Sequence, residues 1–206
     1  MDATTFAYFL TASVLLTLAP GPDILYLLTK SLSDGAKAGI ILACGLASGI
    51  VFHTTLVMIG VAALIKSSAA ALTLLKVFGA AYLLMLAVGA FKAARVGKKI
   101  SMTRSDSKQS SAALYRRGVL MNVLNPKVLL FFLAFLPQFV GTGDVRLTII
   151  FLGVTFALQA LIIFSGVAIC AGRVRNLILR RKNFGRLMNF VEAAVLTIIA
   201  AGLILS

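Results

Sequence analysis

The stretch LTLAPGPDILYLL, residues 16–28, is the most informative part of this sequence. It has the apolar character of a helix interior, yet Pro20, Gly21, Pro22 and Asp23 follow one another within it. One proline costs a helix interior about 3 kcal/mol, and an ionised side chain in the middle of a bilayer costs roughly 3 kcal/mol or more. An apolar segment that contains all four residues is therefore predicted to be an interrupted helix.

The composition around this stretch indicates a membrane protein. Apolar residues make up 60% of the 206 residues, whereas soluble domains have roughly 45–50%. The apolar residues also form blocks of about 20 residues, the length at which a helix crosses a bilayer. The sequence predicts an all-α integral membrane protein with six transmembrane helices. We place them at about residues 6–28, 40–65, 71–91, 118–137, 147–171 and 187–205.

The N-terminal residues do not have the pattern of a cleavable signal peptide. Residues 1–5 carry an acid and no base, and no small-residue cleavage site follows the apolar run. We therefore expect the first span to remain in the mature protein.

The net charge of +14 raises the question of nucleic-acid binding, but the distribution of the charge indicates membrane topology instead. With six spans, the connections after the first, third and fifth spans lie on one side and hold 16 of the 20 Lys and Arg residues. The other side holds Lys66, Lys76 and Arg146. The positive-inside rule then places both termini on the periplasmic side of a bacterial inner membrane. We expect membrane lipid, and no nucleic acid, as a partner.

The chain divides into two halves of three spans, residues 1–94 and 118–206, joined by a basic linker at 95–117 that we expect to be cytoplasmic. Because three is odd, the second half enters the membrane with opposite polarity, which predicts two inverted three-helix repeats. The fourth span contains NVLNPKVLLFF (122–132), and its NPK interrupts that helix as APGPD (19–23) interrupts the first. Interrupted segments at matching places in two halves indicate a binding site near the membrane midplane.

Both interruptions have a residue that can cap a helix, then a proline suited to the first helical position, then a charged residue. These are Gly21, Pro22 and Asp23 in the first half and Asn125, Pro126 and Lys127 in the second. Free N–H groups at a helix start attract a carboxylate, and the acid attracts an ammonium group. The set predicts a site for a zwitterionic amino acid. The alternative is that the acid and the base only pair with each other and hold the broken helices together.

Two further polar residues are weaker candidates for this site because of their helical spacing. Asn122 precedes Asn125 by three positions, and Tyr26 follows Asp23 by three, so each pair shares a helix face.

Three polar residues within other spans have both a structural and a functional interpretation. His53 is either a hydrogen-bonded packing residue, which we favour, or a proton relay. Gln159 either bridges two helices or lines the transport path. Glu192 lies near the end of the sixth span, and we expect its side chain to extend towards the basic connection at 173–186.

The sequence shows no nucleophile–base pair, phosphate-binding loop or cluster of metal ligands, so we expect no enzyme activity, no cofactor and no metal site. A cation exporter built on Asp23 is an alternative, but it has few acids to offer. A thiol–disulfide shuttle is another alternative. Cys44 and Cys170 lie in the second and fifth spans rather than at the prolines, and we expect them to be small packing residues.

In the second span, Gly45 and Gly49 predict a face that another helix approaches closely.

The sequence resembles the LysE/RhtB family of amino-acid exporters, the lysine and homoserine/threonine efflux translocators. The resemblance is carried, in order, by LAPGPDILYLL (18–28), GLASGIVFHTTLVMIGVAALI (45–65), KVFGAAYLLMLAVGAFKAAR (76–95) and RRGVLMNVLNPKVLLFFLAFLPQFV (116–140).

This resemblance implies a six-helix inner-membrane secondary transporter that exports amino acids or their derivatives in exchange for protons. It places the family's signature residues at Pro20, Gly21, Pro22, Asp23, Asn125, Pro126 and Lys127, with a histidine at His53. Glu192 stands where the resemblance implies a small or hydroxyl residue. We expect a neutral substrate because one acid is balanced by one base in the candidate site. Whether the chain forms a homodimer stays open.

Overall fold

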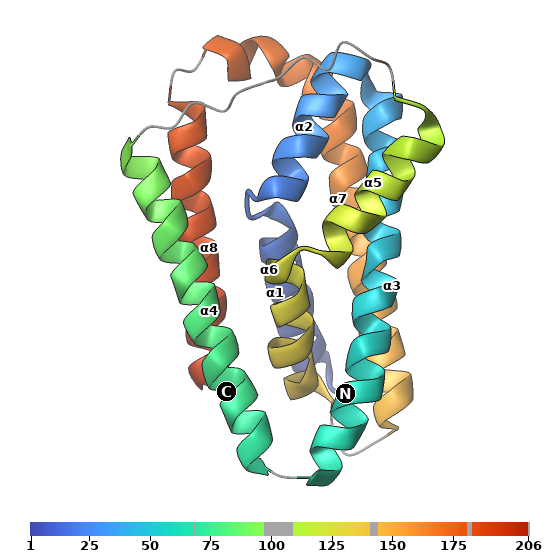
Figure 1. The fold of residues 1–206 in the computed structure, drawn as a ribbon, viewed down its shortest axis with the longest axis vertical. Coiled ribbons are helices and arrows are strands. Elements are labelled where there is room, and N and C mark those ends of the chain that lie inside the picture. Colours follow the sequence, from blue (N-terminus) through green and yellow to red (C-terminus); the bar gives the residue numbers. More distant parts are fainter. Residues whose placement is uncertain (68, 97–108, 141–143, 181–182, 206) are drawn as a thin grey trace.

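The computed structural model describes the chain except residues 68, 97–108, 141–143, 181–182 and 206, and its described elements are all helical (Figure 1). Side chains at 61–69, 71–72 and 172–180 also lie outside the description. The elements are α1 (Ala3–Leu18), α2 (Pro22–Asp34), α3 (Ala36–Ser67), α4 (Ala69–Val96), α5 (Ser111–Val123), α6 (Pro126–Leu130), the π-helical η1 (Phe131–Phe135), the 3-10 helix η2 (Leu136–Phe139), α7 (Val145–Arg180) and α8 (Phe184–Leu205).

Among these described residues, four helices are long and apolar enough to cross a membrane alone. Their candidate spans are Ala36–Gly60, Thr73–Val96, Val145–Ala171 and Phe184–Leu205. Two bent pairs add a span each if each pair is counted as one: Ala3–Leu18 with Pro22–Asp34, bent by 56°, and Ser111–Val123 with Pro126–Phe139, bent by 48°. The structure therefore has four to six candidate spans. The predicted interruptions at the Pro/Gly segments are confirmed.

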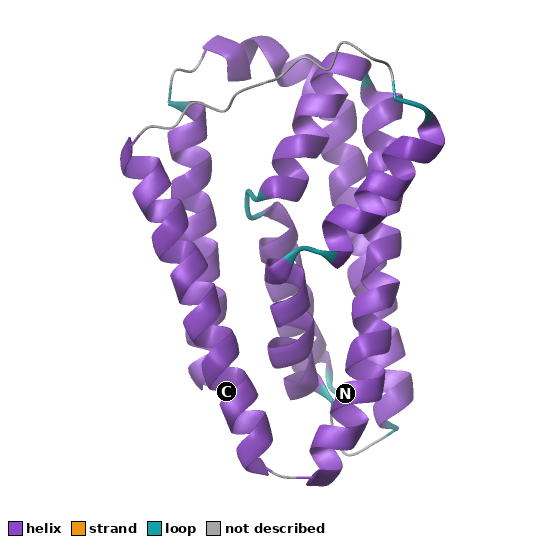
Figure 2. Cartoon of the chain, in the orientation of Figure 1, coloured by secondary structure: helices purple, strands orange, loops and turns teal. Residues whose placement is uncertain are grey.

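Both interruptions lie near mid-height of the molecule (Figure 2). The N- and C-terminal ends of the chain lie at the same end of the bundle, and α2 meets α3 at the opposite end (Figure 1). Gly35 makes that corner with φ of +90°, a backbone conformation that favours glycine. At the N-terminal end, Asp2 caps α1 by accepting a hydrogen bond from the Thr5 N–H at 2.8 Å, and this bond lowers the pKa of the Asp2 carboxyl group.

The largest differences from the sequence prediction are at two helix boundaries. The helix α5 begins at Ser111, within the predicted linker, because the Ser110 hydroxyl caps it by accepting from the Ala113 N–H at 3.2 Å. The helix α7 continues to Arg180 instead of ending near 171. The central part of the predicted linker, 97–108, lies outside the described residues.

The small-residue face of α3 packs closely against α5, as the GLASG motif predicts. A Cβ atom added at Gly45 would collide with the backbone carbonyl oxygen of Tyr115, and one added at Gly49 would lie 2.7 Å from Cβ of Asn122. Gly118 of α5 faces the same crossing, where an added Cβ would lie 2.9 Å from the backbone nitrogen of Leu46. The close approach of these two backbones fixes the position of α5 and of the interruption that follows it.

An aromatic cluster supports the second half of the other broken helix. Phe131, Phe132 and Phe135 of η1 are fully buried. The ring centroids of Phe131 and Phe135 are 4.8 Å apart, and Phe156 of α7 lies 5.4 Å from Phe131 and 5.1 Å from Phe132. Aromatic pairs at these distances each add about 0.5–1.5 kcal/mol beyond the burial of their area. The cluster therefore anchors the helical segment that begins at the NPK motif.

Candidate functional site

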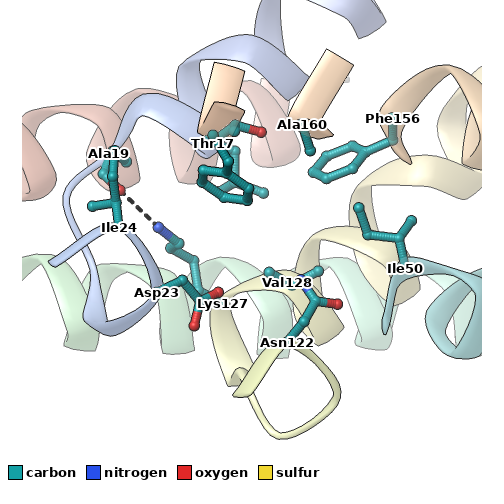
Figure 3. A pocket seen from close by; sticks show the side chains of 12 residues that line it. Thr17, Ala19, Asp23, Ile24, Ile50, Asn122, Lys127, Val128, Phe156 and Ala160 are labelled. Carbon is teal, nitrogen blue, oxygen red and sulfur yellow. Dashed lines mark hydrogen bonds between the residues drawn. The ribbon is translucent and has the colours of Figure 1, made fainter. Parts of the chain in front are cut away.

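The two interruptions meet through buried polar contacts. The Asn125 side chain donates a hydrogen bond from Nδ2 to Oδ2 of Asp23 at 2.6 Å, and these two residues are only 4% and 6% exposed. Lys127 donates from Nζ to the backbone carbonyl of Ala19 at 3.0 Å, and Figure 3 shows this bond beside Asp23. Each bond joins the α1–α2 interruption to the α5–α6 interruption.

The two helix starts at these interruptions are capped differently. Pro22 and Pro126 both take the early helical position that the sequence predicts. Asn125 caps α6 by accepting the Lys127 backbone N–H at 3.0 Å. Gly21 precedes α2 and offers no side chain, so the first N–H groups of α2 have no side-chain acceptor of this kind. At the start of α2 no side-chain cap accepts these donors, and such donors attract an anionic group.

Asp23 and Lys127 do not form a direct ion pair, although both belong to the described part of the chain. Among the described residues, the structure shows an ion pair between Lys30 and Asp34 instead. The alternative interpretation, that Asp23 and Lys127 pair with each other, is therefore wrong, because each of the two binds a different residue of the opposite interruption. Asn125 holds Asp23, and the Ala19 carbonyl holds Lys127. Oδ1 of Asp23 is buried and has no hydrogen-bond partner.

A cavity of about 20 Å³ lies beside these groups (Figure 3). Its polar lining residues are Thr17, Asp23, Asn122 and Lys127. Its remaining lining residues are Leu16, Ala19, Ile24, Ile50, Val128, Phe156, Ala160 and Phe164. This volume is enough for about one water molecule. An amino acid fits only if the surrounding helices move apart.

Two sequence-predicted residues bond near the cavity without lining it. His53 contacts the backbone carbonyl of Asn122 through Nε2 at 3.0 Å, and the rings of Phe52 and Phe132 lie 5.7 Å from its ring. A nitrogen facing a carbonyl is the protonated one, so this bond fixes the tautomer and holds the end of α5 in place. Gln159 of α7 donates from Nε2 to the Thr17 hydroxyl at 2.9 Å, which bridges α7 to α1.

Tyr26 is placed away from the cavity. Its hydroxyl lies 3.4 Å from Oε1 of Gln109, and the guanidinium carbon of Arg117 lies 4.5 Å from the centre of its ring. The helical spacing that relates Tyr26 to Asp23 therefore does not bring it to the same site. Cys44 is half-buried, Cys170 is exposed, both are free thiols, and neither lines the cavity.

Glu192 reaches the site, which differs from the expectation that it extends towards the basic connection. Its Oε1 lies 3.6 Å from the position of a Cβ atom added at Gly21, and Nζ of Lys127 lies 3.0 Å from the same position. Two acids, Asp23 and Glu192, therefore lie close enough to interact with the charge of Lys127. The expectation of a neutral substrate rests on one acid balanced by one base, whereas the site has two acids, Asp23 and Glu192, beside Lys127.

Comparison with known proteins gives the family. The family model described as LysE type translocator matches residues 14–206. An uncharacterized membrane protein of Vibrio cholerae serotype O1 is 35% identical over 173 residues, which is 83% of each chain. The homoserine/homoserine lactone efflux proteins of Salmonella typhimurium and Salmonella typhi are each 34% identical over 170 residues, 82% of this chain and 81% of theirs. No solved structure matches this chain.

A multi-pass membrane protein whose broken helices meet at buried charged groups has the architecture of a transporter. The chain belongs to the LysE type translocator family. It is a membrane efflux translocator and not an enzyme. The resemblance stated from the sequence motifs is thereby confirmed.

Proposed function

We propose that this chain is a secondary active exporter of small amino acids or their derivatives, of the homoserine type, and that it exchanges them for protons. The names of the two Salmonella relatives support the substrate type. The observation that carries the proposal is the buried Oδ1 of Asp23, which has no partner and belongs to a residue that lines the cavity. A buried carboxylate oxygen without a hydrogen bond is unfavourable, and a donor such as a substrate ammonium group would stabilise it.

The remaining polar groups fit the rest of such a substrate. Asn122 also lines the cavity, and its Oδ1 is buried beside Gly49 without a hydrogen-bond partner. The N–H groups at the start of α2 can donate to a carboxylate, or to the carbonyl oxygen of its ester or lactone. Asp23 then alternates between holding the substrate ammonium and holding a proton, and Lys127 balances its charge.

We also propose the topology that the sequence predicts. Residues 1–94 and 118–206 form inverted three-helix repeats, and the linker at 95–117 is cytoplasmic. Both termini are periplasmic in a bacterial inner membrane. Two packing relations support the repeat, because α3 packs against α7 and α4 packs against α8, so that each helix contacts its counterpart in the other half. The 16 basic residues on one side support the orientation.

The test is efflux from cells that accumulate an amino acid from a supplied dipeptide. Expression of the chain is expected to lower internal homoserine and raise external homoserine. Asp23→Asn is expected to abolish efflux driven by a proton gradient while exchange between internal and external homoserine continues. The matched control is Asp2→Asn, which makes the same chemical change at an exposed cap where asparagine also serves. Unchanged efflux of every amino acid, with the protein present in the membrane, would refute the proposal.

A further inference from the structure

Glu192 is an acid that the proposed mechanism does not use, and it stands next to the proposed site. It is half-buried on α8, a helix that otherwise carries no acid. Its carboxylate approaches Gly21, on the same side as the Lys127 ammonium group. It does not line the cavity. Glu192 therefore lies beside Lys127 and outside the lining of the cavity.

The charges at the site can be counted from these positions. When Asp23 has released its proton to bind a substrate, the site has two acids, Asp23 and Glu192, and one base, Lys127. Arg95 of α4 and Arg186 of α8 lie over the rings of Phe91 and Phe190, at 4.9 and 5.9 Å from the ring centroids. The Lys127 hydrogen bond goes to a backbone carbonyl, so its charge stays available to both acids.

We propose that Glu192 determines which charge class of substrate the site prefers, namely monocations that carry an α-ammonium group and a carboxyl group masked as an ester or lactone. With two acids and one base, a bound zwitterion leaves one negative charge uncompensated, whereas a bound monocation leaves none. An uncompensated buried charge is costly in a medium of low dielectric constant. Glu192 is thus a specificity-determining residue, and this inference rests on the function proposed for the same site.

Homoserine and homoserine lactone are a matched pair of probes, because they share a carbon skeleton and differ in the free carboxylate. Efflux of each is measured from vesicles that contain the purified protein, at a pH where the lactone amine is protonated. The wild-type protein is expected to prefer the lactone. Both probes carry the ammonium group, so its weaker attraction cancels in the ratio of their efflux. Removal of a unit negative charge several ångströms from the homoserine carboxylate relieves a repulsion that corresponds to about tenfold in binding. Glu192→Gln is therefore expected to lower the ratio of lactone to homoserine efflux by about tenfold.

Two controls separate the specificity role from a structural one. Asp2→Asn removes an acid at the far end of the bundle and is expected to keep the wild-type ratio. Glu192→Asp keeps the charge and is expected to restore most of the ratio. A purely structural role would reduce efflux of both probes equally, and an unchanged ratio in Glu192→Gln overturns the proposal.

The wild-type protein tests the inference even if the glutamine variant fails to fold. The lactone is then added as a competitor of homoserine efflux, and it should inhibit at lower concentration than homoserine itself. A wild-type preference for homoserine overturns the inference and leaves the proposed export function standing. Transport of neither probe overturns both.

Discussion

Asn125 makes two hydrogen bonds whose contributions can be separated by substitution. Its Oδ1 caps α6, and its Nδ2 holds Asp23 of the other interruption at 2.6 Å. Asn125→Ala removes both bonds. Asn125→Ser keeps a capping hydroxyl and removes the donor to Asp23.

The expected loss of stability follows from these two bonds. Loss of an asparagine cap costs about 1 kcal/mol. A hydrogen bond to a charged group contributes about 1.5–3 kcal/mol, and its loss here leaves a second buried carboxylate oxygen of Asp23 without a partner. Asn125→Ala is therefore expected to lower the free energy of unfolding by about 2.5–4 kcal/mol. Asn125→Ser should lose about 1 kcal/mol less than the alanine variant.

The assay is reversible unfolding of the purified protein in mixed micelles, followed by helix content and compared with homoserine efflux. The matched control is Ser110→Ala, which removes the cap of α5 at an exposed site that has no contact with Asp23. That variant should lose about 1 kcal/mol and keep full efflux. The reasoning is refuted if Asn125→Ala costs no more than Ser110→Ala, since the bond between the interruptions would then contribute nothing.

Two further predictions concern helix packing and the cysteines. Gly45→Ala places a methyl group against the α5 backbone and should lower the free energy of unfolding by about 1–3 kcal/mol. Gly89→Ala, where an added Cβ meets nothing within 4 Å, is the control for the same unfolding measurement, and equal effects of the two would contradict the packing argument. Replacing Cys44 and Cys170 together with serine should leave homoserine efflux intact, because neither thiol lines the cavity. Loss of efflux in that variant, with normal protein levels, would contradict the packing role of the two cysteines.

Features that depend on neighbouring residues in the chain could be predicted from the sequence. The two interruptions, their prolines and the cap at Asn125 follow from the rules for helix starts, and these rules act within one turn. The close approach at Gly45 follows from small-residue spacing in an apolar helix. Helix boundaries were less predictable, since the Ser110 cap starts α5 within a segment that reads as a polar linker.

Contacts between distant segments could not be predicted in the same way. The Ala19 carbonyl that binds Lys127 is a backbone group, and no residue type marks it in the sequence. The direction of the Glu192 side chain depends on how α8 is rotated relative to the α1–α2 interruption, which local rules do not determine. The available signal was the residue itself, because an acid within a membrane span is by default a candidate functional residue.

The bonds between the interruptions also determine what a substrate has to replace. The cavity of about 20 Å³ accepts roughly one water molecule, so a larger ligand enters only if the two interruptions separate. Separation breaks the Asn125–Asp23 and Lys127–Ala19 bonds. A ligand shifts this equilibrium only by the difference in its affinity for the two states. An ammonium group restores a donor to the Asp23 carboxylate. A ligand that lacks a donor leaves both oxygens of Asp23 buried without a partner. Opening of the site is therefore linked to the group that a substrate presents to Asp23.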